Sequence, residues 1–229
     1  MNIVIPASMK SKRLPGKPLL VAGGKSLLQW TYERAREVSD SVIIATGNTD
    51  VSSHCKSKGI SHVLSSGSHS NGTSRVWEAI ANYHGRLDFP IVNWQVDEPL
   101  LAPNFIRRLD QVDSSAMVWT LVSLLNGREK SDPNTVKVIL IRDGVCQWFS
   151  RASMAGAFGH CGIYCYLTSL PLIESSQNSS RNTYSESEGL EQLDWIEAGI
   201  SIKAKVMDEL PLSINTKQDW DKFKSIVEG

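Results

Sequence analysis

The chain has 229 residues, with 24 Lys and Arg balanced by 24 Asp and Glu and with 41% hydrophobic residues. This length and composition support a substantial apolar core and exclude a disordered chain. A formal net charge of zero, without a long Lys/Arg run, argues against nucleic acid as a partner, because nucleic-acid binders neutralise phosphates with basic patches.

The N-terminus and the cysteines predict a cytoplasmic protein. No basic segment precedes the apolar residues 3–5, as a secretory signal requires, and no run approaches the roughly 18 apolar residues of a membrane span. The four cysteines show no C-x-x-C spacing, and Cys161 and Cys165 would lie about 13 Å apart on a strand, beyond disulfide reach. We therefore expect reduced cysteines and no membrane partner.

In the first half, β-rich apolar runs alternate with amphipathic segments, which is typical of a buried sheet covered by helices. The fold class is therefore α/β. Predicted strands occupy residues 2–6, 41–46, 60–64 and 89–95. Predicted helices occupy residues 26–38, 50–58, 73–83 and 104–112, and loops occupy 6–18 and 65–72.

The second half predicts an antiparallel addition to the sheet. Strands at 136–141 and 145–149 flank Arg142-Asp143-Gly144, and Asp-Gly favours a tight hairpin turn. Further predicted elements are a strand at 160–167, a loop at 175–187, a helix at 186–198 that ends at Gly199, a strand at 200–206, and a helix at 216–227 capped by Asn215 or Thr216. Because no linker interrupts these elements, we expect a single domain over residues 1–229.

A basic loop follows the first strand directly. Residues 6–18 carry Arg13, Lys17 and further lysines at a carboxyl edge of the sheet, where open α/β sheets bind ligands. Backbone N–H groups combined with Arg and Lys suit a polyphosphate. The equally weighted alternative is a solvated loop with a Pro-Gly turn. A P-loop is excluded, because Leu19 stands where that motif needs glycine before Gly24-Lys25-Ser26.

Two acids end the apolar strand at 89–95. Asp97 and Glu98 precede Pro99, and carboxylates at such a position can hold Mg²⁺ together with substrate phosphates. Taken alone, an Asp at the start of a loop is more often an ordinary turn residue.

Residues 68–75 join a polar loop to a helix N-terminus, which suits an anion or a base edge. The alternative is that Thr73 merely caps the helix. Further along, His160 and Tyr164 share one face of a strand, although a lone strand histidine is more often structural.

Glu188, Glu191 and Gln192 are spaced to share one face of the predicted helix, which is ordinarily a solvated face. A G-x-S-x-G elbow, a Ser/His/Asp triad order and zinc-ligand spacings are absent from the sequence. Covalent hydrolases and zinc enzymes are therefore excluded.

Together and in this order, the motifs resemble those of the CMP-Kdo synthetases, the 3-deoxy-manno-octulosonate cytidylyltransferases. The resemblance runs nearly end to end. The matching segments are Ile5-Pro6-Ala7, Ser11 to Leu19, Ala45-Thr46, His69 to Arg75, Asn93 to Pro99, Pro133 to Val138, Phe149-Ser150-Arg151, His160 to Tyr164, Leu190 to Leu193, and Asn215 to Asp219.

The resemblance implies a three-layer, Rossmann-like nucleotide-diphospho-sugar transferase fold with a mixed, mostly parallel central sheet. It implies transfer of CMP from CTP to the anomeric hydroxyl of an acidic eight-carbon sugar, Kdo, with release of pyrophosphate and Mg²⁺ as cofactor. The product would serve lipopolysaccharide or polysaccharide synthesis. It also implies a homodimer, with a dimerisation and sugar-binding portion around residues 133–206.

Carried over residue by residue, the resemblance implies catalytic roles for Lys17, Asp97 and Arg13, and a metal site at Asp97 and Asn215. The implied nucleotide-binding residues are Pro6, Ala7, Ser8, Arg13, Lys17, Asn71, Gly72, Thr73 and Arg75. The implied sugar-binding residues are Gln95, His160, Tyr164, Glu191 and Gln192.

Several positions depart from the family pattern. Ser8, Gly47, Val96 and Asn215 replace the family's Arg, Asp, Gly and Asp, and only residues 152–159 connect two segments that the family separates with a longer insertion. The amide of Asn215 can still coordinate Mg²⁺, with one negative charge fewer. These departures leave three readings: a weakened Kdo enzyme, a cytidylyltransferase for a different sugar acid, or a catalytically impaired nucleotide-binding homologue.

Overall fold

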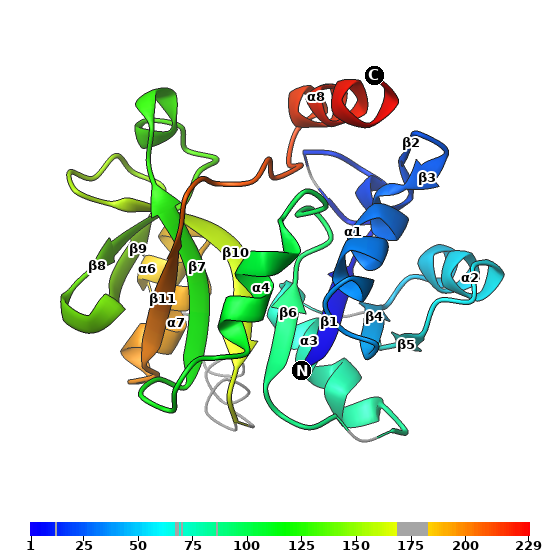
Figure 1. The fold of residues 1–229 in the computed structure, drawn as a ribbon, viewed down its shortest axis with the longest axis horizontal. Coiled ribbons are helices and arrows are strands. Elements are labelled where there is room, and N and C mark those ends of the chain that lie inside the picture. The colour runs from blue at the N-terminus through cyan, green and yellow to red at the C-terminus, as the bar shows by residue number, and fades with distance from the viewer. Residues whose placement is uncertain (12, 67–68, 70, 86, 169–182) are drawn as a thin grey trace. The chain divides into compact units, whose positions relative to one another are not determined.

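The computed structural model describes residues 1–11, 13–66, 69, 71–85, 87–168 and 183–229. It contains two compact units, one of Met1–Ile106 with Pro211–Gly229 and one of Arg107–Leu210. The ribbon is drawn in Figure 1. The unit boundary falls within the helix α4, Pro103–Leu109. No described helix is long and apolar enough to cross a membrane.

A parallel sheet forms the centre of the first unit. Its strand order is β6-β1-β4-β5, with β1 Asn2–Ala7, β4 Val42–Thr46, β5 His62–Leu64 and β6 Ile91–Trp94. Almost every residue of β1, β4 and β6 is buried, as expected for strands that are covered on both faces. All four strands match predicted ones, within the usual uncertainty of strand ends.

Three helices connect these strands: α1 Leu27–Arg36, α2 Thr49–Ser57 and α3 Gly72–Asn82 (Figure 1). The strand order places β4 and then β5 on one side of β1, and β6 on the other side. Because parallel crossovers are right-handed, α1 and α2 cover one face of the sheet and α3 covers the other. The carboxyl ends of β1 and β6 therefore open onto one edge of this sheet.

The C-terminal segment belongs to the first unit. Helix α8, Lys217–Glu228, begins at Thr216, whose side chain accepts a hydrogen bond from Asp219 N at 3.2 Å. Of the two predicted caps, Thr216 is therefore the cap. Phe223 packs edge-on against Trp30 of α1 at 6.1 Å between ring centroids, and buried Ile214 joins the same apolar cluster. Helix α8 also lies against β2 (Val21–Ala22), which forms a short hairpin with β3 (Lys25–Ser26).

The second unit contains a mixed sheet. Its strands are β7 Val118–Leu124, β8 Lys137–Leu140, β9 Cys146–Ser150, β10 Phe158–Tyr166 and β11 Ile202–Met207. Strand β11 pairs in parallel with β7, whereas β7, β10, β8 and β9 pair antiparallel in that order. The α/β class with mixed sheet pairing is therefore confirmed.

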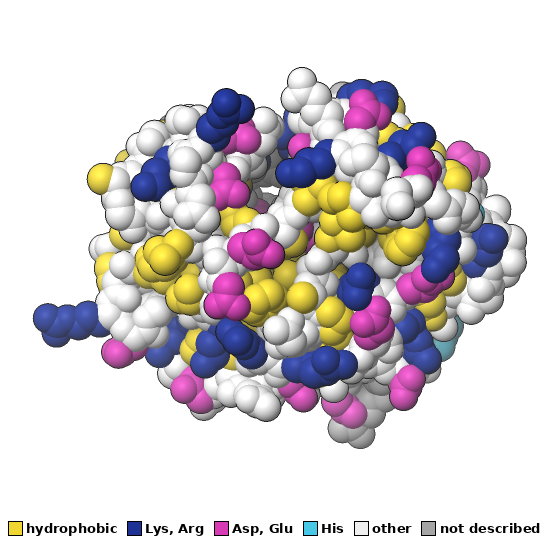
Figure 2. Space-filling view, turned by 45° about the horizontal axis from the view of Figure 1, so that its top comes forward, with side chains coloured by type: hydrophobic (Ala, Val, Ile, Leu, Met, Phe, Trp, Pro, Cys, Tyr) yellow, Lys and Arg dark blue, Asp and Glu magenta, His cyan; other side chains and the backbone are white. Residues whose placement is uncertain are grey.

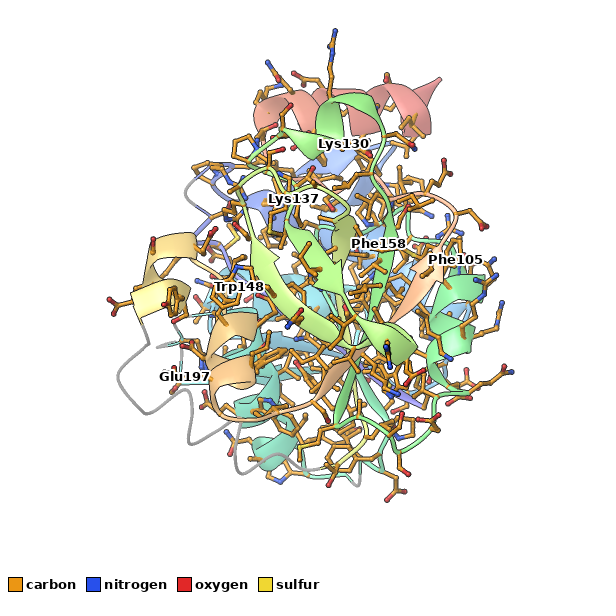
Figure 3. All side chains as sticks on the ribbon, turned by 90° about the vertical axis from the view of Figure 1, so that its left-hand side faces the viewer. Phe105, Lys130, Lys137, Trp148, Phe158 and Glu197 are labelled. Atoms are coloured by element: carbon orange, nitrogen blue, oxygen red, sulfur yellow. The ribbon has the colours of Figure 1, made fainter. Side chains whose placement is uncertain are left out.

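The β8–β9 hairpin has the predicted turn. Asp143 and Gly144 both have positive φ, 60° and 74°, which the Asp-Gly pair tolerates. Figure 3 shows the hairpin with its Lys137 and Trp148 side chains and the nearby helix α7. The Lys137 side chain is buried, and its Nζ donates to the carbonyls of Asp132 and Arg151.

The structure corrects two predictions and adds one strand. The helix predicted at 186–198 is two short helices, α6 Thr183–Glu188 and α7 Gln192–Glu197, because Gly189 with φ 65° ends the first. Of the loop predicted at 175–187, residues 183–187 are helical and the others lie outside the described residues. Strand β7 was not predicted, although its apolar run is almost wholly buried.

Candidate active site

The predicted basic loop and the predicted strand-end acid meet in the first unit. Lys17 Nζ lies 2.5 Å from Asp97 Oδ2 and also donates to the carbonyl of Ile214 at 3.1 Å. Gly16, with φ 70°, ends the loop and lets the short 3-10 helix Lys17–Leu19 begin there. The backbone N–H of Ile214 donates to the carbonyl of Asp97 at 2.9 Å. Three segments distant in sequence are thus bonded at one point.

Arg13 and Asn215 continue this network. Arg13 Nη2 donates to Asn215 Oδ1 at 3.0 Å, and Asn215 follows Ile214 in the chain. Arg13 is exposed, whereas the Lys17 side chain is almost wholly buried. One network therefore contains a buried cation, Lys17, paired with the Asp97 carboxylate and an exposed cation, Arg13, bonded to Asn215, and two such cations can neutralise a polyphosphate.

Glu98 is the residue of this region whose importance sequence reasoning missed. It is 3% exposed, and Ser213 Oγ donates to its Oε1. Burial and, to a smaller extent, the neighbouring Asp97 carboxylate raise the pKa of Glu98 to about 8. Among the described residues, Glu98 Oε2 has no hydrogen-bond partner. The sequence marked Glu98 only as a second acid, because nothing local predicts its burial or its contact with Ser213.

A second polar cluster lies at the end of β6 and the start of α3. Asn93 is fully buried; it accepts a hydrogen bond from Gln95 Nε2 at 2.9 Å and donates to Thr73 Oγ1 at 3.3 Å. A Cβ atom added to Gly72 would lie 3.0 Å from Gln95 Oε1 and 3.3 Å from Pro6 Cγ. Four predicted ligand-binding residues, Pro6, Gly72, Thr73 and Gln95, are therefore neighbours.

The start of α3 is capped by Asn71 rather than by Thr73. Asn71 Oδ1 accepts a hydrogen bond from Ser74 N at 2.8 Å, which leaves buried Thr73 available for the contact with Asn93. Arg75 lies on the first turns of the same helix, and burial lowers the pKa of its guanidinium.

Ala7 is fully buried at the end of β1, and Ser8 follows it as a half-buried residue whose Oγ accepts from Lys10 N at 3.2 Å. Ser8 is too short to carry a cation toward a phosphate, so this position offers a hydroxyl only. Within the motifs that carried the family resemblance, Lys12 and Ser70 lie outside the described residues.

The other four predicted sugar-binding residues, His160, Tyr164, Glu191 and Gln192, belong to the second unit. His160 Nε2 is 2.9 Å from Thr120 Oγ1, and the ring of His160 lies 5.5 Å from that of Tyr164. An irregularity in β10 adds two residues between these positions, so both side chains stay on one face as predicted. Burial lowers the pKa of His160 to about 3 and raises that of Tyr164.

Helix α7 contributes to this second cluster, but not as a single helical face with Glu188. Gln192 Nε2 donates to the Tyr164 hydroxyl, and Glu191 is the residue directly before the helix. Glu188 ends α6 instead, where its carboxylate accepts from Ser150 Oγ at 2.6 Å and from Arg151 N at 2.7 Å. The shared-face prediction was wrong because Gly189 interrupts the helix, and Glu188 serves to hold β9.

The donor set in the first unit suits Mg²⁺ only in combination with a substrate. Outside residues 12, 67, 68, 70, 86 and 169–182, no three His, Cys, Asp or Glu side chains gather into a metal-binding group. Mg²⁺ is commonly held by one or two protein oxygens, with water and substrate phosphates completing its shell. The Asp97 carboxylate and the Asn215 amide oxygen, held in the same bonded network, fit that requirement.

The chain is similar to known cytidylyltransferases. A cytidylyltransferase family model matches residues 2–202. The 3-deoxy-manno-octulosonate cytidylyltransferases of Photobacterium profundum and Aliivibrio salmonicida are each 34% identical, covering 99% of this chain and 98% of theirs.

A solved CMP:2-keto-3-deoxy-manno-octonic acid synthetase complexed with CTP superposes with a TM-score of 0.88 at 29% identity, covering 99% of this chain and 98% of that chain. The inositol-1-phosphate CTP transferase of T. maritima, at 11% identity and a TM-score of 0.69 over 99% of this chain and 94% of its own, shares the fold alone. The chain belongs to the cytidylyltransferase family, and it is a CTP-dependent cytidylyltransferase.

Proposed function

We propose that this cytidylyltransferase transfers CMP from CTP to the anomeric hydroxyl of an ulosonic acid, with Kdo as the first candidate, and releases pyrophosphate. The observation that carries the proposal is the bonded network of Lys17, Asp97 and the 214–215 segment, with Arg13 attached. Cations and a metal-binding carboxylate at one sheet edge are what in-line attack on an α-phosphorus needs, because that reaction depends on positioning and charge neutralisation.

Each residue has a role in this proposal. Arg13 and Lys17 bind the triphosphate, and they stabilise the charge that moves onto the departing pyrophosphate. Asp97 and Asn215 would hold Mg²⁺, which when bound supplies further neutralisation of the phosphate oxygens. The Asn71–Arg75 turn, together with Pro6, Ala7 and Ser8, forms the nucleotide-binding surface in this assignment.

The acceptor-binding residues in this proposal are those that the family resemblance implies: Gln95, His160, Tyr164, Glu191 and Gln192. Because burial keeps the His160 ring neutral, it can accept or donate one hydrogen bond but supplies no positive charge for the sugar carboxylate. Tyr164 is buried and bonded to Gln192, so it supports the neighbouring side chains. We further propose a cytoplasmic homodimer that associates through residues 133–206.

A different sugar acid is the second candidate acceptor. It is favoured by the short connection at residues 152–159, since the resembling family carries there an insertion with an arginine near the sugar carboxylate. The relative from Photobacterium aligns over 246 positions, more than the 229 residues of this chain, so it carries segments that this chain lacks. A catalytically impaired nucleotide binder is the third candidate, favoured by Ser8 and Asn215.

One assay separates the three candidates: CTP-dependent pyrophosphate release with Mg²⁺, measured across Kdo and related sugar acids. Release with Kdo supports the first candidate. Release only with another acid identifies a change in acceptor specificity. No release with any acid, alongside CTP binding by calorimetry, supports the impaired binder and contradicts the proposal.

A further inference from the structure

We propose that Glu98 is a positioning residue whose buried carboxyl group, through Ser213, holds the chain segment carrying Ile214 and Asn215 against Asp97. This inference rests on the proposed metal role of Asp97 and Asn215. It adds a residue that does not itself touch the metal or the nucleotide, together with the serine through which it acts.

Three links, two direct hydrogen bonds and one bridge through Lys17, join the end of β6 to the 213–215 segment. Ser213 Oγ donates to Glu98 Oε1, and Ile214 N donates to the carbonyl of Asp97 at 2.9 Å. Lys17 Nζ bridges the Asp97 carboxylate and the Ile214 carbonyl. Of the three links, the Ser213–Glu98 contact is the only one made wholly by side chains outside the proposed phosphate and metal contacts, so it can be removed without removing a proposed ligand.

Glu98 is also held from its own strand. Trp94 Nε1, fully buried in β6, donates to the Glu98 carbonyl at 3.0 Å, and this fixes the backbone of Glu98 relative to the sheet. The fixed strand end on one side and the Ser213 hydroxyl, which donates to the Glu98 carboxylate, on the other make Glu98 a rigid link between the sheet and the C-terminal segment.

Burial of the Glu98 carboxyl group lowers the stability of the fold. Glu98 is 3% exposed and its Oε2 has no hydrogen-bond partner among the described residues. A buried carboxyl with an unsatisfied oxygen destabilises a fold relative to an apolar residue of similar volume. Stability alone therefore does not account for Glu98, whereas alignment of the two proposed metal-binding residues does.

The consequence of losing the Glu98–Ser213 contact follows from the spacing of residues along the chain. Asn215 lies two residues after Ser213, so release of Ser213 lets the Asn215 amide and the Ile214 carbonyl drift from Asp97 and Lys17. A displacement of about 1 Å is enough to weaken a coordinated or reacting group substantially. The expected loss is therefore in metal affinity rather than in the folding of the chain.

The test is a titration of the full-length protein with Mn²⁺ in the presence of CTP, followed by electron paramagnetic resonance of free Mn²⁺. For Ser213→Ala and Glu98→Ala we expect about tenfold weaker Mn²⁺ binding, with the same circular dichroism as the wild type. Glu98→Gln keeps an acceptor for Ser213 and should restore binding to within about twofold. The double variant should bind no more weakly than Glu98→Ala alone, because both substitutions break one contact.

Ser150→Ala is the matched control. It removes a similar contact, from Ser150 Oγ to the Glu188 carboxylate in the second unit, and should leave Mn²⁺ affinity unchanged. Wild-type affinity in Ser213→Ala overturns the positioning role while leaving the proposed metal site intact, and this holds even where Glu98→Ala does not fold. Absence of Mn²⁺ binding by the wild type overturns the metal site and this inference together.

Discussion

Lys17 and Asp97 form an ion pair of 2.5 Å, and 80 residues of chain separate them. The Lys17 side chain is about 10% exposed and the Asp97 side chain 21%, so the pair lies where solvent screening is reduced. A partly buried pair of this kind costs desolvation on both sides and is weak evidence of a stabilising role. The pair places one positive and one negative side chain at the carboxyl edge of the sheet, in the same network as Arg13 and Asn215.

Asp97→Ala should lower CTP-dependent pyrophosphate release by at least about 100-fold, because it removes the charged oxygen donor of the proposed metal site. The fold should persist, since the apolar cores do not depend on this side chain. Steady-state kinetics with circular dichroism measure both effects. Asp221→Ala, which removes an exposed carboxylate on α8, is the control. Activity retained in Asp97→Ala would show that the metal site lies elsewhere.

Asn215→Asp should lower the Mg²⁺ concentration for half-maximal activity by about five- to tenfold, because a second carboxylate binds a hard cation more tightly than an amide. The new charge also faces Arg13, so the existing contact becomes an ion pair. Asn82→Asp, at the exposed end of α3, adds the same charge away from this network and should change nothing. An unchanged Mg²⁺ dependence in Asn215→Asp would count against Asn215 as a metal ligand.

Gly72→Ala should weaken CTP or acceptor binding by about tenfold with little loss of stability. The added Cβ would meet Gln95 Oε1 at 3.0 Å and Pro6 Cγ at 3.3 Å, so the flexible Gln95 side chain must move and its bond to Asn93 is disturbed. Calorimetric titration with CTP and the acceptor KM measure the two effects. Wild-type values for both would show that Gln95 and Gly72 lie outside the binding surface.

His160 should make the folded state less stable at acidic pH. The unfolded chain protonates this histidine below about pH 6.5, whereas burial lowers the folded-state pKa to about 3. The unfolded state therefore binds more protons between these values, and the free energy of unfolding falls as the pH drops through this window.

Urea unfolding at pH 7 and pH 5 tests this expectation. The histidine should contribute a loss of about 2 kcal/mol between these pH values, and His160→Gln should remove that part of the loss. His84→Gln, at an exposed position, should leave the pH dependence as in the wild type. The expectation fails if His160→Gln and the wild type lose stability equally.

Local patterns predicted most elements well, and the failures have identifiable causes. The helical spacing of apolar residues predicted α1, and the Asp-Gly pair predicted the β8–β9 turn. Strand β7 was missed although its unbroken apolar run was a usable signal, and β11, its parallel partner, lies about 80 residues later. Gly189 could have marked the break between α6 and α7, since its neighbours are helix formers and it is not.

The sequence by itself determined the α/β class, the basic loop after β1, the acid after β6 and the family, because each is a local pattern or an ordered set of motifs. Only the tertiary structure decided that Lys17 pairs with Asp97 and that Glu98 is buried against Ser213. Those contacts join segments through three-dimensional packing, and neither the composition nor the periodicity of either segment encodes its partner.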